Sequence, residues 1–344
     1  MAREPFVSAE RGRPPADRLG LHRLAAILVI IQAAMLAFDV IGFHATGLTY
    51  EWKTRAIDIG IPAALMLAWA YFFVWPGRRP GDWVVAEMWL VLALFISISA
   101  IAPVGQYAAV AFKRPLIDPW LAAFDAAIGA HVPTWAAWVS GQPLLLKVLL
   151  YAYLSLLAQF FLPILLLGVW YRNRIAMWEY AFHFHVCSAI VLVCLALWPV
   201  AIPGPYYGFK MAFNLSRFIE QFSGVYSGAI TTIRPEDMEG LVSFPSFHVA
   251  GAVMVTWALR QSRVWMAILL PINLLLTVAT VLTGVHYVAD LFGTAAMCAI
   301  SLWLYRRFAV RWLEPGNTPV HSRETVPPDY GVGADGVSQL EGTR

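Results

Sequence analysis

Charged side chains are scarce in this sequence. Asp, Glu, Lys and Arg make up 13% of its 344 residues, whereas a soluble domain carries about 25%. The hydrophobic share is 60%. This balance argues against a soluble domain, and the net charge of +3 is too small to indicate a nucleic-acid partner.

Cysteine is also scarce. The three cysteines, Cys187, Cys194 and Cys298, all lie inside apolar stretches. None has the CxxC or Cys/His spacing of a zinc site, and three isolated thiols do not make a disulfide framework. We therefore predict no metal site and no cofactor from them.

Long apolar runs are what the sequence has in abundance. Runs of about 20 residues, enough to cross a hydrocarbon core of about 30 Å, recur along the chain. They predict an all-α polytopic membrane bundle of about eight transmembrane helices. The expected spans are 24–46, 57–76, 84–103, 145–170, 178–199, 245–262, 264–283 and 286–305.

The arginines predict how this bundle is oriented. They flank the spans at Arg11, Arg13, Arg18, Arg23, Arg78, Arg79, Arg172, Arg174, Arg260, Arg263, Arg306, Arg307 and Arg311. With eight spans all of them share one side, which the positive-inside rule makes cytoplasmic. The segments 47–56, 104–144, 200–244 and 283–286 then face outward. Short loops with many arginines and few cysteines favour a bacterial inner (plasma) membrane.

Three regions are expected along the chain. Residues 1–23 form a cytoplasmic N-terminal segment, and 24–312 form one membrane domain with its core at about 84–306. Residues 313–344 are polar and rich in Pro and Gly, which predicts a disordered cytoplasmic tail.

One outward segment carries two spaced aspartates. Asp118 precedes a proline, so it is a suitable N-cap for a short helix lying in the membrane interface. Asp125 follows seven residues later, roughly on the same face. Capping and solvation explain both residues adequately, and a functional role is the alternative.

The first motif with chemical potential is SFPSFH, residues 243–248, at the predicted outer start of the 245–262 span. A proline early in a helix leaves free backbone N–H groups in the first turn, which form a cradle for phosphate. The Ser246 hydroxyl adds a donor, and His248 adds a proton source.

The second motif is TGVHYVAD, residues 283–290, at the outer start of the last span. Asp290 follows His286 by one helical turn and can accept one ring N–H, which leaves the other nitrogen free to attack. A single histidine at a helix end is ordinarily only a polar residue. Two histidines at matching depth, with an aspartate inside a span, favour catalysis. His183 and His185 lack an acidic partner, so we expect structural roles for them.

Together these motifs resemble the catalytic signature of the type 2 phosphatidic acid phosphatase superfamily. The surrounding sequence, including DPWLAAFDAAIG at 118–129, is most similar to its inositol phosphorylceramide synthase-like branch, which is related to sphingomyelin synthases. The resemblance implies a six-helix core with the site at one end and no metal ion. It implies His286 as a nucleophile that forms phosphohistidine, Asp290 as its orienting partner and His248 as the acid for the leaving alcohol.

Two positions depart from the phosphatase pattern. Thr280 stands where that branch has an arginine six residues before the nucleophile, which moves the prediction towards the synthase branch. Arg114-Pro115 is present, but Tyr107 replaces the expected lysine and Lys113 is adjacent instead. We count Lys113, Arg114, Ser246 and Tyr287 as candidate substrate-binding residues. Membrane-surface charge is the alternative for Lys113 and Arg114.

The predicted function is therefore a membrane-embedded phosphotransferase acting on a lipid phosphate or phospholipid headgroup. Hydrolysis by a lipid phosphate phosphatase is the first alternative. A transporter with a His/Asp proton relay is the alternative from another class, although no repeated half or pair of broken helices is present. A haem- or metal-binding bundle and an inactive receptor are weaker hypotheses. The polar 200–244 segment is the predicted place for substrate selection.

Overall fold

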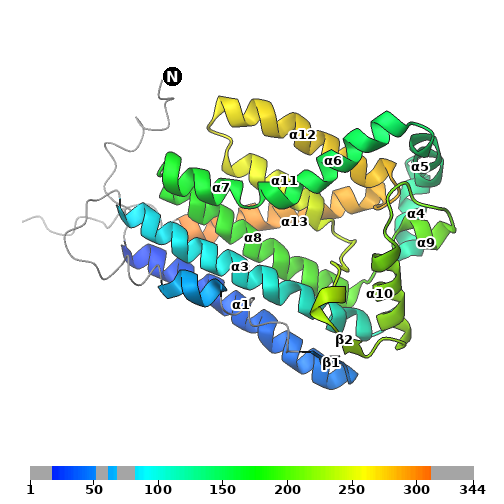
Figure 1. The fold of residues 1–344 in the computed structure, drawn as a ribbon, viewed down its shortest axis with the longest axis horizontal. Helices are drawn as coiled ribbons and strands as arrows, with labels where there is room; N and C mark the ends of the chain where they lie inside the picture. Colours follow the sequence, from blue (N-terminus) through cyan, green and yellow to red (C-terminus); the bar gives the residue numbers. More distant parts are fainter. Residues whose placement is uncertain (1–17, 52–60, 68–81, 311–344) are drawn as a thin grey trace, which may run out of the picture.

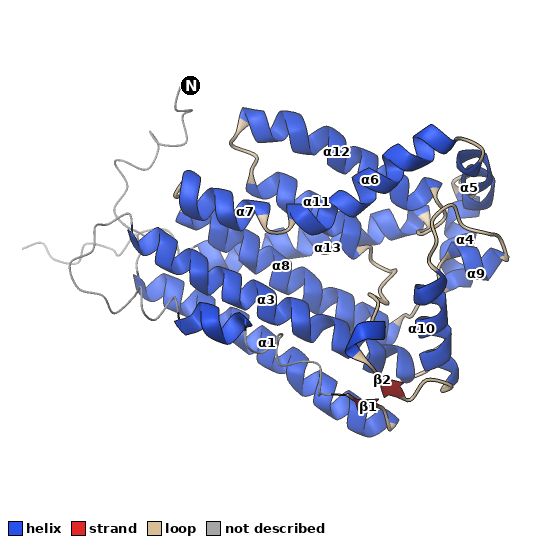
Figure 2. Ribbon diagram, viewed as in Figure 1, coloured by secondary structure: helices blue, strands red, loops and turns tan. Residues whose placement is uncertain are grey.

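The computed structural model describes residues 18–51, 61–67 and 82–310, and within them the chain is a helical bundle with one small sheet (Figures 1 and 2). Most of the predicted N-terminal segment and the whole predicted tail lie outside the described residues. Of the span expected at 57–76, only 61–67 are described, and they are helical.

Long helices run the length of the bundle. They are α1 (Arg18–Thr46), α3 (Asp82–Ala111), α8 (Arg174–Leu197), α12 (Arg263–Leu282) and α13 (Val288–Leu304), which η5 (Tyr305–Ala309) continues. The shorter helices are α4 (Asp118–Ala127), α5 (Val132–Ser140), α6 (Pro143–Gln159), α7 (Leu162–Leu165), η3 (Leu166–Trp170), α9 (Pro203–Tyr207), α10 (Ser216–Ser227), η4 (Pro235–Asp237) and α11 (Phe247–Ala258). The strands are β1 (Thr49–Tyr50) and β2 (Thr232–Ile233), which pair in parallel.

Five described helices are long and apolar enough to cross a membrane: α1, α3, α8, α12 and α13 with η5. The α5–α6 pair makes a sixth only if its 113° bend is counted within one span. The predicted 245–262 span holds α11, whose 12 residues measure about 18 Å. The all-α membrane bundle is therefore confirmed, while the count of eight spans stays a prediction.

Helix α8 is the centre of the bundle. The most apolar stretch of α8 is 72% buried, against 22–44% for the corresponding stretches of the other four candidate spans. It packs against α1, α3, α11 and α13. Its first turns carry partly buried ion pairs: Arg174 pairs with Glu87 of α3, and Glu179 pairs with Arg260 just beyond α11 at 3.0 Å. These ion pairs join three helices at one end of the bundle.

The two histidines of α8 have definite partners. His185 Nδ1 bonds to the Ala181 carbonyl at 2.7 Å, and its Nε2 lies 2.8 Å from the Gln32 amide nitrogen. His183 Nδ1 bonds to the Ser301 hydroxyl at 2.7 Å. The expectation that neither histidine has an acidic partner is wrong for His183, because its Nε2 lies 3.8 Å from Glu179. The sequence signal was the four-residue spacing on one helix face.

The opposite end of the bundle gathers α4, α5, α9, α10 and the β1–β2 sheet (Figure 1). These elements come from 47–56, 104–144 and 200–244, the segments predicted to share one side. Parallel pairing of Thr49 with Thr232 and Tyr50 with Ile233 joins the first of these segments to the last. Helices α11 and α13 begin at this end, which brings the two motifs together.

Candidate active site

The two motifs meet in one chain of buried hydrogen bonds. His286 Nε2 lies 3.1 Å from Ser246 Oγ, and His286 Nδ1 lies 2.9 Å from Asp290 Oδ2. Ser246 is the N-cap of α11, where its Oγ accepts the Val249 N–H at 3.3 Å. Asp290 lies in the first turn of α13. The predicted pairing of His286 with Asp290 is therefore present in the structure.

The surroundings of Asp290 decide which tautomer His286 adopts. Asp290 Oδ2 also accepts the Tyr287 backbone N–H at 3.0 Å and lies 3.5 Å from the Ser243 hydroxyl. An ionised carboxylate can only accept hydrogen bonds, so Asp290 Oδ2 accepts a third one from the Nδ1–H of His286. Nε2 is then the unprotonated nitrogen and accepts from the Ser246 hydroxyl. This is the protonation state that a histidine nucleophile needs.

His248 lies on the first turn of α11, two residues after Ser246. Its ring stacks on Tyr153 of α6, with centroids 4.4 Å apart and planes 15° from parallel. Tyr153 in turn contacts the ring of Phe213 edge-on at 5.4 Å. The stack fixes the plane of the His248 imidazole beside the Ser246–His286 pair while the side chain stays partly exposed.

A short segment, 209–213, lies against the turn before His286. Phe209 packs against Gly284, whose φ of +81° gives the sharp turn before His286 and leaves no room for a Cβ. The Ala212 N–H donates to the Thr283 carbonyl at 3.2 Å. Phe213 at the other end packs on Tyr153. Lys210 is exposed between these anchored neighbours.

Asp118 and Asp125 of α4 hold the start of α13. Asp118 Oδ1 accepts the Tyr287 hydroxyl at 2.9 Å, and its Oδ2 accepts the Ala201 N–H at 2.9 Å. Asp125 accepts the N–H groups of Val288 and Ala289 at 2.9 and 2.8 Å. Both aspartates are 1% exposed. Burial raises the pKa of each carboxyl above its ordinary value.

These contacts correct two sequence expectations. Asp118 does not cap α4, whose N-cap residue is Ile117 without a side-chain bond. Solvation does not explain the two aspartates, because both are buried and bind residues 287–289. Their seven-residue spacing was the available signal, and it gave no information about partners far along the chain.

The side chains of the remaining predicted substrate-binding residues take no part in the Ser246–His286–Asp290 hydrogen-bond chain. Tyr287 is buried, with its hydroxyl on Asp118. Lys113 Nζ donates to the Ser227 carbonyl of α10 at 3.1 Å. Both Lys113 and Arg114 are exposed and line a cavity of about 500 Å³ between the ends of α3 and α8. In the described part of the chain, neither has a recorded contact with Ser246, His286 or Asp290.

Thr280 does not replace the missing arginine as a polar group facing the site. Its side chain is fully buried in α12 and its hydroxyl donates to the Thr277 carbonyl at 2.7 Å. Within the described ranges, no group of three or more His, Cys, Asp or Glu side chains is arranged to hold a metal ion.

Comparison with known proteins identifies a family for this chain. No curated protein and no solved structure matches the chain. The family model of the PAP2 superfamily matches residues 119–304, which is more than half of the 344 residues and contains both motifs. The match does not distinguish the branches of that superfamily. With its apolar helices and paired motifs, the chain belongs to the PAP2 superfamily, whose members are generally phosphatases or phosphotransferases.

Proposed function

We propose that this protein is a membrane-embedded lipid phosphotransferase that works through a phosphohistidine on His286. The Ser246–His286–Asp290 hydrogen-bond chain supports this proposal most directly, because it presents an unprotonated imidazole nitrogen at the start of two helices. The substrate is a lipid phosphate or a phospholipid headgroup, as the family and the apolar surroundings favour.

In the first step, His286 Nε2 attacks phosphorus and the bond from phosphorus to the leaving oxygen breaks. His248 gives a proton to that oxygen, so the alcohol leaves neutral. Asp290 stabilises the positive charge that develops on the His286 ring. Ser246 turns its hydroxyl from Nε2 to a phosphoryl oxygen, and the first free N–H groups of α11 face the same oxygens.

In the second step, neutral His248 removes a proton from the acceptor hydroxyl while that oxygen attacks phosphorus. The N–P bond breaks and the phosphate leaves on the acceptor. An alcohol acceptor makes the protein a transferase, and water makes it a phosphatase. Thr280, in place of the phosphatase arginine, favours the transferase of the inositol phosphorylceramide synthase-like branch.

Cations beside the site must balance the phosphate charge. Lys210 is our first candidate, since its neighbours Phe209 and Ala212 contact the turn before His286. We assign Lys113 and Arg114 to the headgroup of a bound lipid instead of the reacting phosphate, because they line a separate cavity. Selection of donor and acceptor is proposed for the 200–244 segment.

The membrane setting is part of the proposal. We infer a catalytic domain over 24–312, an active site on the outer face and both termini in the cytoplasm of a bacterial cell. Selective labelling of single cysteines introduced at 229 and 261, in intact cells with an impermeant reagent, tests this. Labelling at 229 alone supports the orientation, and labelling at 261 alone reverses it.

The function is tested with purified protein and phosphorus-labelled phosphatidic acid, with and without an acceptor alcohol. We expect the wild type to transfer label to the alcohol or release it as phosphate, and His286→Ala to do neither. His131→Ala, which removes an exposed histidine at the same end of the bundle, is the matched control and should stay active. Equal turnover by the wild type and His286→Ala would reject the proposed nucleophile.

A further inference from the structure

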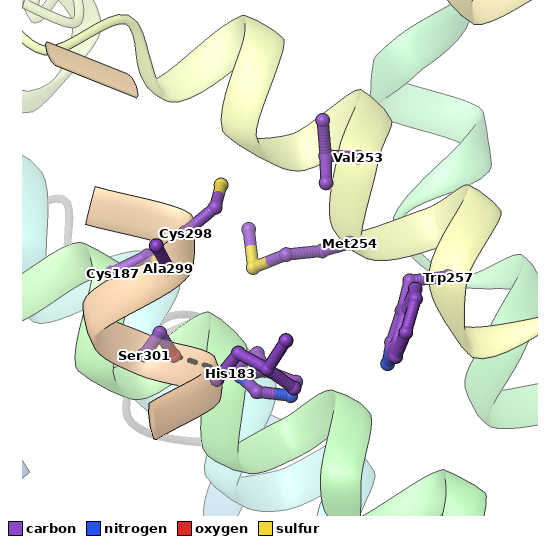
Figure 3. A pocket seen from close by; sticks show the side chains of 9 residues that line it. His183, Cys187, Val253, Met254, Trp257, Cys298, Ala299 and Ser301 are labelled. Atoms are coloured by element: carbon purple, nitrogen blue, oxygen red, sulfur yellow. Dashed lines mark hydrogen bonds between the residues drawn. The ribbon is translucent and has the colours of Figure 1, made fainter. Parts of the chain in front are cut away.

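A second cavity lies between the two helices that carry the motifs. It has a volume of about 220 Å³, and α8, α11 and α13 contribute its walls (Figure 3). Val253, Met254 and Trp257 line it from α11, and Cys298, Ala299 and Leu302 line it from α13. The lining is apolar apart from a few atoms. It contains no predicted site residue, so the proposed reaction leaves this cavity unexplained.

The directions of the helices order this lining by depth. Both α11 and α13 run away from the active site, so Val253 and Cys298 are nearer to it than Trp257 and Ser301. The deep end is polar, because His183 bonds to Ser301 there. The buried Nε2 of His183 lies 3.8 Å from the Glu179 carboxylate, which is longer than a hydrogen bond. An apolar chain can therefore fill the upper cavity but cannot extend past this floor without desolvating polar groups.

The depth of the floor equals about one leaflet. Ser301 follows Asp290 by eleven residues of α13, which is about 17 Å of helix. Half of a hydrocarbon core of about 30 Å is about 15 Å. The rim of the cavity is also open towards the side of the bundle, since Val253 and Ala299 are exposed. A lipid chain can enter from the bilayer without passing through the protein.

We propose that this cavity holds the end of one hydrocarbon chain of the lipid whose phosphate is at His286, and that its floor limits the preferred chain length. The inference rests on the proposed function for the position of the phosphate. The cavity then makes the enzyme select its substrate by chain length as well as by headgroup.

Filling the cavity tests this inference through kcat/KM. Ala299→Phe puts a ring into the rim, and we expect kcat/KM for dipalmitoyl phosphatidic acid to fall about tenfold, equal to about 1.4 kcal/mol. Dioctanoyl phosphatidic acid, whose chains end above the cavity, should change less than about twofold. Ile300→Phe is the matched control, because it adds a ring to the adjacent exposed side chain outside the cavity. Equal losses for both lipids, or the same selective loss in the control, would overturn the proposal.

A binding measurement separates this inference from the reaction. In a Cys187→Ala/Cys194→Ala protein, Cys298 is the one remaining thiol, and it lines the cavity. We expect dipalmitoyl phosphatidic acid to slow its alkylation by N-ethylmaleimide severalfold, and dioctanoyl phosphatidic acid to have little effect. The same protection should persist with His286→Ala added, because binding needs no turnover. If dipalmitoyl phosphatidic acid protects Cys298 but the wild type turns over no substrate, the proposed reaction is rejected and the cavity proposal stands. If neither lipid protects Cys298, the cavity proposal is rejected.

Discussion

Replacing Asp290 with asparagine isolates the charge behind the nucleophile. Three donors point at Asp290 Oδ2: His286 Nδ1–H, the Tyr287 backbone N–H and the Ser243 hydroxyl. The asparagine amide oxygen is therefore expected to take this position, since the amide nitrogen would otherwise face the Tyr287 backbone N–H, which can only donate. The His286 tautomer survives, and what disappears is the negative charge.

The size of the effect follows from that picture. A hydrogen bond to a charged group contributes about 1.5–3 kcal/mol, against about 0.5–1.5 kcal/mol for a neutral one. Loss of this difference of about 1–1.5 kcal/mol at the transition state lowers kcat by about 5- to 13-fold. Stability should change little, because Asp290 Oδ1 is already buried without a partner and the amide N–H replaces one such atom with another. We expect the melting temperature to stay within about 3 °C.

The assay is single-turnover release of label from phosphatidic acid, with melting temperature measured on the same samples. Glu51→Gln, at an exposed acid next to β1 at the same end of the bundle, is the matched control and should keep full activity. An Asp290→Asn protein with wild-type kcat would show that the carboxylate charge does not assist the reaction. One as inactive as His286→Ala would show that the tautomer was lost.

Further substitutions probe the other positions. Ser246→Ala removes both the cap of α11 and the hydrogen bond to His286 Nε2, so we expect about 1 kcal/mol less stability and a kcat loss smaller than that of His286→Ala. Urea unfolding measures the first effect and kinetics the second. An unchanged kcat would remove Ser246 from the mechanism. His248→Ala should abolish transfer from lipid donors but keep reaction with p-nitrophenyl phosphate, whose leaving group needs no proton, and equal loss for both would contradict the acid role. Lys210→Met should raise KM for lipid phosphate about tenfold, whereas Lys210→Arg should keep KM near the wild-type value. Lys147→Met, at another exposed lysine, should leave KM unchanged. An unchanged KM in Lys210→Met would exclude Lys210 as the cation that binds the phosphate. Burial raises the pKa of Asp118 above 3.8, so the stability that the protonated carboxyl contributes is complete below pH 3.8 and is lost as pH rises through the folded-state pKa. The melting temperature of wild type should therefore fall more steeply with rising pH than that of Asp118→Asn. Parallel curves for the two proteins would refute a raised pKa at Asp118.

The proximity of the motif residues could be predicted from the sequence because their relationships are local or follow from topology. Asp290 lies one helical turn from His286, so their pairing needs no tertiary information. Ser246 and His286 are 40 residues apart, but α12 separates their helices and returns the chain, so both start at one end.

The roles of the α4 aspartates could not be predicted in the same way. The contacts that Asp118 and Asp125 make at the start of α13 join residues more than 160 positions apart. A carboxylate before a proline predicts a helix N-cap from the sequence. Only the packing of α4 on α13 brings it into contact with the start of α13. Lys113 and Arg114 illustrate the converse case, because their position in a motif suggested the site while their contacts belong to α10 and the end of α3.

The number of membrane crossings was uncertain for a physical reason. Hydropathy counts apolar residues, but it does not detect a bend such as the 113° turn between α5 and α6. It also does not distinguish a 12-residue helix with non-helical flanks, as in α11, from a full span. Both features occur next to the motifs, where the backbone departs from straight helices.

Trapping the covalent intermediate tests the central claim most directly. Wild-type protein is mixed with phosphorus-labelled phosphatidic acid, quenched within one turnover in alkali, digested and analysed by mass spectrometry. The account predicts phosphate on His286, stable in alkali and lost in acid, and absent from His286→Ala. Phosphate on Ser246, which shares the same hydrogen-bond chain, or product formation without any covalent phosphate would contradict it.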